Sequence, residues 1–496
     1  MNILSDRFSE IKKASEPLYR TPKSVQETVE ILKISEGGIF EVAEGRYSKT
    51  YRFSDVNYAT RTENEQESFF QKYCKCLNSF DCTFKITVNN KNRDMEALRN
   101  EVMLGLRKDG FDEMRESYNR IIEEKILEGR QGIEQERYIT VTVKRKNFEE
   151  AKAQFATIES TMFKSFAELG SRLTLLSGNE RLRILHDYYR LGREDEFNFD
   201  IKKGRITGTD FANEICNSSI KYYPNCFEDE GKVGRVLFIK KYPTYLSDRF
   251  FTELTFLPVH SITSVDVVPV PKDLTMKMLQ KKYLGIESDI IKQQRTRNRN
   301  NDFSSDISYA TRQKKRDIEE IMNNVRENDE SLFYVSVTMI VMAESRKELN
   351  SMCKTIDSIA KGAGCAVDTC MYKQREAVNT TLPIGVRQIE TMRTMLTQSL
   401  AVLMPFNVQE LCDRDGIYYG VNQISRNIIV GNRKKLLNGN GFIFGVSGAG
   451  KSFQAKMEMG SVLLSTDDNV IAVDPMNGAK RSYLKRVGAI FIKLYA

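Results

Sequence analysis

Eight consecutive residues near the C-terminal end of the sequence have the spacing of a phosphate-binding loop. Residues 445–452 read GVSGAGKS, which fits the pattern GxxxxGK[ST] at every fixed position. Average residue usage gives such a match by chance in only a few chains of this size per hundred, so an ordinary glycine turn is the weaker interpretation. Glycines allow positive φ angles, and inward-pointing N–H groups at a helix N-terminus then attract a phosphate. The loop therefore predicts a nucleotide site.

Each residue type in this loop has a defined role towards a nucleotide. We expect Lys451 to reach the β- and γ-phosphates and the Ser452 hydroxyl to ligate Mg²⁺, so these two residues are the catalytic candidates. The backbone of the loop is expected to surround the phosphates. The candidates for binding the nucleotide are Gly445, Val446, Ser447, Gly448, Ala449, Gly450, Lys451, Ser452 and Phe453. The cofactors predicted are ATP and Mg²⁺.

Asp474 is a second and weaker candidate for the metal. It ends the apolar stretch 470–473, as an acidic residue ends a Walker-B strand, but it lies close after Lys451 and precedes Pro475. A hydrolytic site needs carboxylates for the metal and for the attacking water, and residues 475–496 contain no Asp or Glu. A capping or turn role for Asp474 is an equally good interpretation.

The elements around the loop have the order of a parallel sheet with helices on its faces. Residues 441–444 predict a short strand, and residues 451–465 predict the helix that the loop opens. A buried type of strand is expected at 470–473, followed by a short helix over 480–486 and a strand at 490–492. This β-α-β-α-β order is the opening of an α/β domain.

Two similar strand–helix–strand units precede this domain. The patterns over residues 138–176 and 334–371 each predict an alternating strand, an amphipathic helix and a second strand. An ancient duplication is one explanation, and coincidence is the other, because β-α-β units are common. Upstream of the first unit, residues 39–53 predict a hairpin, residues 63–77 a helix, and residues 91–133 a charged helical stretch.

A basic segment separates the two units. Residues 292–316 are polar, rich in arginine and without clear periodicity over their first part, which predicts a mobile surface loop, while Arg312 to Arg316 open the next helix. Arginines there could contact phosphates of DNA or lipid, and a solvated loop is the plainer alternative.

Composition sets broad limits on the chain. Its 496 residues suffice for about three domains at ~150 residues each, and its net charge of +8 permits an acidic partner without requiring one. No stretch reaches the ~18 consecutive apolar residues of a spanning helix, and residues 1–13 lack the apolar core of a signal peptide. We therefore expect a cytoplasmic chain whose attachment to a membrane goes through a partner.

Cysteine and histidine usage argues against other chemistry. The nine cysteines include no CxxC pair, and the chain has two histidines, His186 and His260. These are too few for a zinc site or for a histidine-activated nucleophile, so reduced structural thiols are expected.

In the loop and in other segments, the sequence resembles a known family, the VirB/TrbE/CagE conjugation ATPases (the fourth VirB component). It is most similar in character to the members from Gram-positive conjugative elements. The resemblance covers about residues 30–496 and is strongest after residue 380. The segments that carry it are 51–58, 242–246, 381–385, 404–406, 409–411, 416–422, 432–434, 437–441, GVSGAGKSF at 445–453, 454–456 and 473–475.

The resemblance implies an α/β fold, with an α+β N-terminal region followed by the start of a RecA-like P-loop NTPase domain with a parallel sheet. The domains expected are a lead-in over 1–30, a first β/α unit over 31–235, a second over 236–405 and the beginning of the ATPase domain over 406–496. Residues 476–479 depart from the family, which usually has an acidic pair there. The family also continues through a Walker-B segment and an arginine finger, so we expect a C-terminally truncated chain.

The implied function is an ATP-binding motor subunit of a conjugative type IV secretion system, in which ATP hydrolysis drives channel assembly or substrate transfer. The implied partners are further copies in a homo-oligomer, often a hexamer, and inner-membrane channel components. The implied location is the cytoplasm, peripheral at the inner face of the cell membrane. Two alternatives remain open: a DNA translocase of the HerA/FtsK group, which a basic loop lining a pore would favour, and a non-catalytic docking or scaffold fragment.

Overall fold

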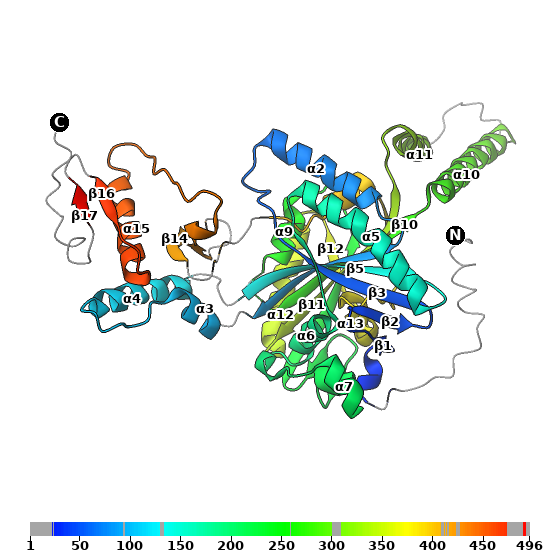
Figure 1. Cartoon of the computed structure of the whole chain (residues 1–496). Coiled ribbons are helices and arrows are strands. Elements are labelled where there is room, and N and C mark those ends of the chain that lie inside the picture. The colour runs from blue at the N-terminus through cyan, green and yellow to red at the C-terminus, as the bar shows by residue number, and fades with distance from the viewer. Residues whose placement is uncertain are drawn as a thin grey trace.

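The computed structural model describes residues 22, 24–92, 95–128, 133–257, 259–299, 309–407, 411, 413, 416–422, 427–473 and 490–492. These residues form a large body around one antiparallel sheet and a smaller lobe beside it (Figure 1). The fold is mixed α/β. A parallel RecA-like sheet is absent from the described residues, whose parallel strands are one two-stranded pair in the lobe.

The first half of the body contains a three-stranded start, a helix and two long strands joined by a helical insertion. Its elements are β1 (Lys33–Ile34), β2 (Ile39–Ala43), β3 (Arg46–Phe53), α2 (Glu63–Asn78), β4 (Thr83–Asn92), α3 (Met95–Val102), α4 (Asp112–Glu128), β5 (Ile133–Lys144), α5 (Phe148–Leu169), β6 (Leu173–Leu175) and α6 (Gly178–Tyr189). The predicted hairpin over 39–53 and the helix over 63–77 are confirmed.

The second half repeats the same order of elements. It contains β7 (Ile220–Tyr222), β8 (Phe227–Asp229), β9 (Lys232–Lys241), α9 (Arg249–Thr255), β10 (Ser261–Val270), α10 (Lys272–Arg299), α11 (Tyr309–Glu327), β11 (Leu332–Ala343), α12 (Arg346–Gly362), β12 (Ala366–Thr369) and α13 (Gln374–Thr381). Short helices α7 (Ile201–Thr207) and α8 (Phe211–Ile215) join the halves, and β13 (Arg393–Leu396) and α14 (Thr397–Ala401) follow.

Strand pairing in the sheet is symmetric about its middle. The order is β1-β2-β3-β5-β4-β10-β11-β9-β8-β7, with β6 added beside β3 and β12 beside β9. Each strand of the first half therefore has a counterpart in the second, and the halves meet where β4 pairs with β10 in antiparallel register. Both predicted strand–helix–strand units are present, and this topology favours duplication over coincidence. The expected domain boundary between residues 235 and 236 falls inside β9. That whole strand belongs to the second half, because it pairs with β11 and β12.

The two faces of the sheet are covered by different helices. One face packs its apolar side chains against α2, α5, α9 and α12, and the other packs against α6 and α13. Strand β11 lies near the middle of the sheet and is buried on both faces along almost its whole length, including the polar residues Ser336 and Thr338. Corresponding helices also start alike, because Asn147 caps α5 and Ser345 caps α12 by accepting a backbone N–H.

On the α6 and α13 face, the end of α13 and the non-helical residues after it cross the sheet. This segment, residues 380–387, is named the strap. Lys85 of β4, whose side chain is only 2% exposed, donates from Nζ to the carbonyl oxygens of Thr380, Leu382 and Val386, the last two at 3.3 and 3.0 Å. One ammonium group thus satisfies three buried backbone acceptors that have no place in a ladder.

Hydroxyl groups of neighbouring strands complete this attachment. Each lies on the same face as Lys85 and donates to a carbonyl oxygen of the strap. The donors are Ser48 to Ile384 O, Thr50 and Thr140 to Pro383 O, Thr142 to Gly385 O, and Ser264 to Thr381 O. Arg181 of α6 adds hydrogen bonds to Pro383 O and Ile384 O from the other side. The strap is therefore held by side chains on both sides.

The basic segment 292–316 differs from the expected loop. Residues 292–299 continue α10, residues 309–316 belong to α11, and residues 300–308 lie outside the described residues. The helix that opens near Arg312 is confirmed. The sequence did not show that α10 extends to Arg299, because polar residues interrupt its apolar spacing. The two helices contact each other through an ion pair between Lys315 of α11 and Glu287 of α10 at 3.0 Å. Together α10 and α11 form a hairpin that projects from the body (Figure 1).

No helix in the described part of the chain is long and apolar enough to cross a membrane. Eight cysteines in the described residues are free thiols, and burial raises the pKa of several, such as that of Cys74 to about 12. No group of three His, Cys, Asp or Glu side chains in the same residues is placed to hold a metal ion.

The strap predicts a large effect of removing the Lys85 ammonium. We expect Lys85→Met to lower the free energy of unfolding by about 1–3 kcal/mol, because it leaves buried carbonyl oxygens without a donor. Urea unfolding followed by circular dichroism measures this change. Lys72→Met, at an exposed site on α2, is the matched control. Equal stability of the two variants would contradict the role given to Lys85.

The buried His260 predicts a loss of stability in acid. Its Nδ1 has no hydrogen-bond partner among the described residues, and burial, aided by the Lys232 ammonium, lowers the pKa of His260 from 6.5 to about 4. Between these two values the unfolded chain takes up a proton that the folded chain does not. The contribution of His260 to the free energy of unfolding is therefore fully present above pH 6.5, and it falls by about 3 kcal/mol as the pH drops to 4.

Unfolding in urea at a series of pH values, with wild type and His260→Gln, measures this contribution. The wild type should lose more stability than the variant between pH 6.5 and 4. Parallel curves for the two proteins would rule out His260 as the source.

Candidate phosphate-binding site

Residues 445–452 form a turn that leads into a helix, as the sequence predicts. Helix α15 (Lys451–Ser465) begins directly after Gly450, and the predicted helix over 451–465 is confirmed. Gly448 and Gly450 have φ values of 82° and 88°, in the left-handed region that favours glycine. A Cβ at either position would meet no atom within 4 Å, so the backbone conformation, and not space, calls for glycine there.

Lys451 lies over the loop that precedes it. Its Nζ donates to the carbonyl oxygens of Gly445 and Val446, both at 2.8 Å. Ser452 is exposed in the first turn of α15. The first N–H groups of a helix have no partner within the helix, so Lys451, Ser452 and these N–H groups meet at one helix N-terminus. The structure thus brings the two catalytic candidates together with the loop backbone.

The expected strand at 441–444 is not formed. Those residues have no strand pairing within the described part of the chain, and Phe442 and Phe444 are 83% and 87% exposed and stack on each other with ring centroids 5.7 Å apart. An alternating apolar run forms a strand only where another strand offers its backbone groups. The expectation was wrong here because the described residues supply no such neighbour.

The strands after the helix agree in part with the expectation. β16 (Ile471–Val473) and β17 (Ile490–Ile492) pair in parallel, as predicted, but Ile471 is 63% exposed and so is not a buried strand residue. Asp474, the weak metal candidate, and the helix expected over 480–486 lie outside the described residues. Their part in the site therefore stays a prediction.

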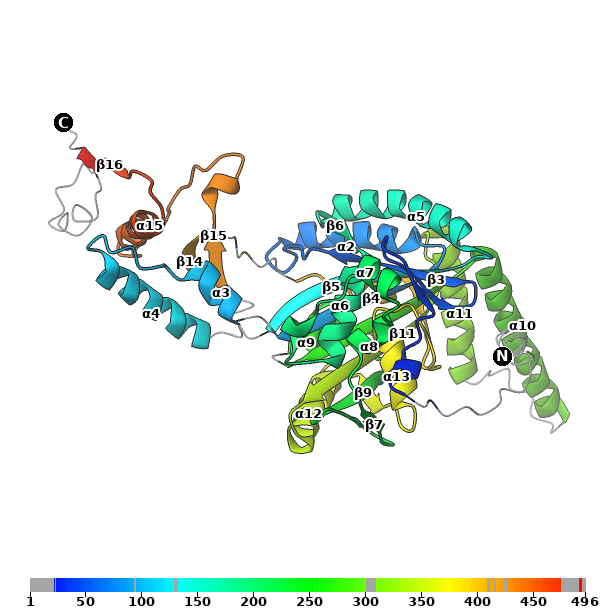
Figure 2. The ribbon, with the colours of Figure 1, turned by 60° about the horizontal axis from the view of Figure 1, so that its bottom comes forward.

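Helix α15 is held by the insertion from the first half of the body. An apolar cluster joins α15 to the α3–α4 insertion and its connecting loop, which lie side by side in Figures 1 and 2. Its members are Leu104, Phe111, Met114, Met459, Leu463, Leu464 and Val470. The hairpin β14 (Ile417–Val421) and β15 (Ile428–Gly431) packs on the same insertion through Ile428 and Val430. The insertion thus ties the phosphate-binding loop to β4 and β5.

Arg115 is the polar centre of this contact. Its side chain is 1% exposed and donates to Asp109 Oδ1 at 2.7 Å, to Asp112 Oδ1 at 2.9 Å and to the carbonyl oxygen of Leu464 at 3.2 Å. The bond from Arg115 is the largest cause that holds the pKa of Asp109 well below its usual range. Arg107 adds an ion pair to Asp467 at 2.7 Å.

Sequence reasoning missed Arg115 and its partners. Asp112 and Arg115 have the i, i+3 spacing of a helical ion pair, which was a usable signal, but charged residues at that spacing are commonly solvated. Glu458 was missed as well: it accepts from Arg433 at 2.7 Å and from Tyr419 at 3.2 Å, which fixes the β14 side of α15.

No protein-family model matches the chain, and no curated protein matches it.

The contacts of the buried Arg115 predict that the packing of α15 on the insertion depends on this side chain. We expect Arg115→Met to weaken the packing of α15 on the insertion by about 2 kcal/mol, because it removes the guanidinium donor from the carbonyl oxygen of Leu464 and from two carboxylates. Hydrogen exchange of the α15 amides should then be faster than in wild type. Arg120→Met, which changes an exposed arginine on α4, the helix that carries Arg115, is the control. Unchanged exchange in the Arg115 variant would contradict the role of this contact.

Proposed function

We propose that the chain binds ATP with Mg²⁺ through residues 445–453 and is the ATP-binding subunit of a conjugative type IV secretion machine. The observation that supports nucleotide binding most directly is the loop itself: Gly448 and Gly450 in the left-handed region, followed at once by Lys451 on a helix N-terminus. In this arrangement Lys451 would exchange the carbonyl oxygens of Gly445 and Val446 for phosphate oxygens.

The proposed metal ligand is Ser452, since a hydroxyl at that place in the first turn can reach Mg²⁺ between the phosphates. The weaker proposal is that Asp474 lies near the metal. ATP and Mg²⁺ would supply the phosphoryl chemistry, and the residues named here would bind and position them. Hydrolysis needs carboxylates for the metal and for the attacking water, and the sequence candidate Asp474 lies outside the described residues. We therefore propose nucleotide binding first and turnover as a property of the assembled machine.

A motor must pass a change at its nucleotide to the rest of the molecule, and the α3–α4 insertion is suited to this. It packs on α15 at one end and continues into the central strands β4 and β5 at the other. A shift of α15 on nucleotide binding would therefore move groups fixed to the sheet. The proposed partners are further copies of the chain and inner-membrane channel components, and the proposed place is the cytoplasmic face of the membrane.

A DNA translocase is the second candidate, because the α10–α11 hairpin exposes basic residues away from the body. Lys292 has a 74% exposed side chain, and Arg295 is also exposed. Duplex DNA binding that falls steeply with salt and is lost in a Lys292→Gln/Arg295→Gln variant would favour this candidate.

Nucleotide binding tests the proposed function. With a fluorescent ATP analogue and Mg²⁺, we expect Lys451→Ala to weaken binding at least about tenfold, because a charge-assisted phosphate contact is lost. Ser452→Ala should remove the enhancement by Mg²⁺. Lys456→Ala, an exposed change one turn further along α15, should bind like wild type.

The outcome also separates the candidates. Binding that is absent in wild type, or is the same in the Lys451 and Lys456 variants, would overturn the ATP-binding proposal and leave a docking or scaffold protein.

A further inference from the structure

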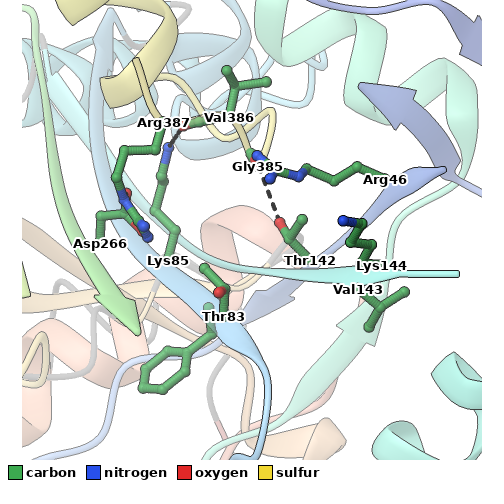
Figure 3. A pocket seen from close by; sticks show the side chains of 11 residues that line it. Arg46, Thr83, Lys85, Thr142, Val143, Lys144, Asp266, Gly385, Val386 and Arg387 are labelled. Atoms are coloured by element: carbon green, nitrogen blue, oxygen red, sulfur yellow. Dashed lines mark hydrogen bonds and ion pairs between the residues drawn. The ribbon is translucent and has the colours of Figure 1, made fainter. Parts of the chain in front are cut away.

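A second place in the molecule gathers positive charge around a hollow. At the edge of the strap there is a cavity of about 160 Å³, lined by β3, β4, β5, β10 and the strap (Figure 3). Its charged lining residues are Arg46, Lys85, Lys144 and Arg387, with Asp266 as the acidic one. The phosphate-binding loop of α15 has no residue in this lining.

The acidic residue is already neutralised. Arg387 Nε and Nη2 donate to the two carboxylate oxygens of Asp266 at 2.7 and 2.9 Å, and the Asp266 side chain is 2% exposed. This bidentate pair fixes the guanidinium of Arg387 at the cavity. Lys85 lies deeper and uses its N–H groups on the strap. The inner wall is therefore rigid and carries a net positive charge.

The outer wall carries two cations that face each other. Arg46 and Lys144 are direct partners in the antiparallel register of β3 and β5, so their side chains leave the sheet on the same face. Both are exposed, and neither makes an ion pair with a described acidic residue. Like charges in this position destabilise a sheet, and Arg145 and Lys146 extend the basic run.

Two threonine hydroxyl groups line the cavity between the two walls. Thr83 and Thr142 are also direct cross-strand partners and line the cavity. Figure 3 shows Thr142 bonded to Gly385 O, and Arg46 extending towards Gly385 from the other side. The one hydroxyl hydrogen of Thr142 is therefore used by the strap, which leaves the Thr83 hydroxyl and the guanidinium and ammonium groups as the kinds of donor with which proteins bind phosphate oxygens.

We propose that this cavity is a binding site for a phosphate group, with Arg46 and Lys144 as direct ligands and Arg387, held by Asp266, as the third cation. A bound phosphate would offset the repulsion between the two facing cations. The volume exceeds the ~30 Å³ share of one water molecule severalfold, so an oxyanion fits together with water. The group can belong to a free phosphate compound or to a lipid headgroup, since both present the same oxygens.

The test uses the full chain carrying Lys451→Ala, which removes the phosphate contact at α15. Inorganic pyrophosphate is titrated by calorimetry, and vesicles of phosphatidylglycerol are compared with vesicles of phosphatidylcholine by co-sedimentation. We expect Arg46→Gln/Lys144→Gln to weaken binding at least about tenfold. Lys152→Gln/Lys164→Gln on α5 removes the same charge at exposed sites and should change binding by less than about threefold.

A thermal melt distinguishes loss of a ligand from loss of folding. The unliganded Arg46/Lys144 variant should melt no lower than the parent protein, because two facing like charges are gone. Binding of pyrophosphate alone identifies a free phosphate compound, and binding of phosphatidylglycerol alone identifies a headgroup. Absence of both, or equal weakening by the two double variants, overturns the proposal.

Discussion

The body depends on the fixing of one extended segment by side chains instead of by a strand ladder. The strap carries a row of buried carbonyl oxygens across the face of the sheet, and Lys85 supplies three of the hydrogen bonds that they need. Burial of that ammonium is costly, and it lowers the pKa of Lys85 to about 8. The cost is offset by the hydrogen bonds that the ammonium donates to buried carbonyl oxygens of the strap.

This arrangement also links the two halves of the chain. The strap begins at the end of α13 in the second half, yet most of its donors lie on β3, β4 and β5 of the first half. Among the described residues, strand pairing joins the halves only between β4 and β10, so the strap is a further connection that does not depend on the strand ladder. The polar face beneath it explains why hydroxyl-rich strands can be central in this sheet.

Elements with a local signal could be predicted from the sequence. The phosphate-binding turn, α15, the first hairpin and both strand–helix–strand units depend on spacing within a few residues, and they formed where expected. What failed depended on distant partners. Lys85 lies between Phe84 and Ile86 in an alternating strand and would be assigned to a solvated face, because nothing nearby shows that the strap covers it. Residues 441–444 have the right composition for a strand, but the described residues offer them no partner.

The two helical insertions make the ends of the symmetric sheet different from each other. The insertions α3–α4 and α10–α11 follow β4 and β10, and because these two strands are antiparallel, the insertions leave the sheet at opposite ends (Figure 1). The α3–α4 insertion packs against the C-terminal lobe of its own chain, while the α10–α11 insertion extends outwards as a hairpin. The two ends of the sheet therefore present different surfaces. Contact between unlike surfaces of successive copies repeats head to tail and builds rings or filaments, whereas a two-fold contact pairs one surface with itself.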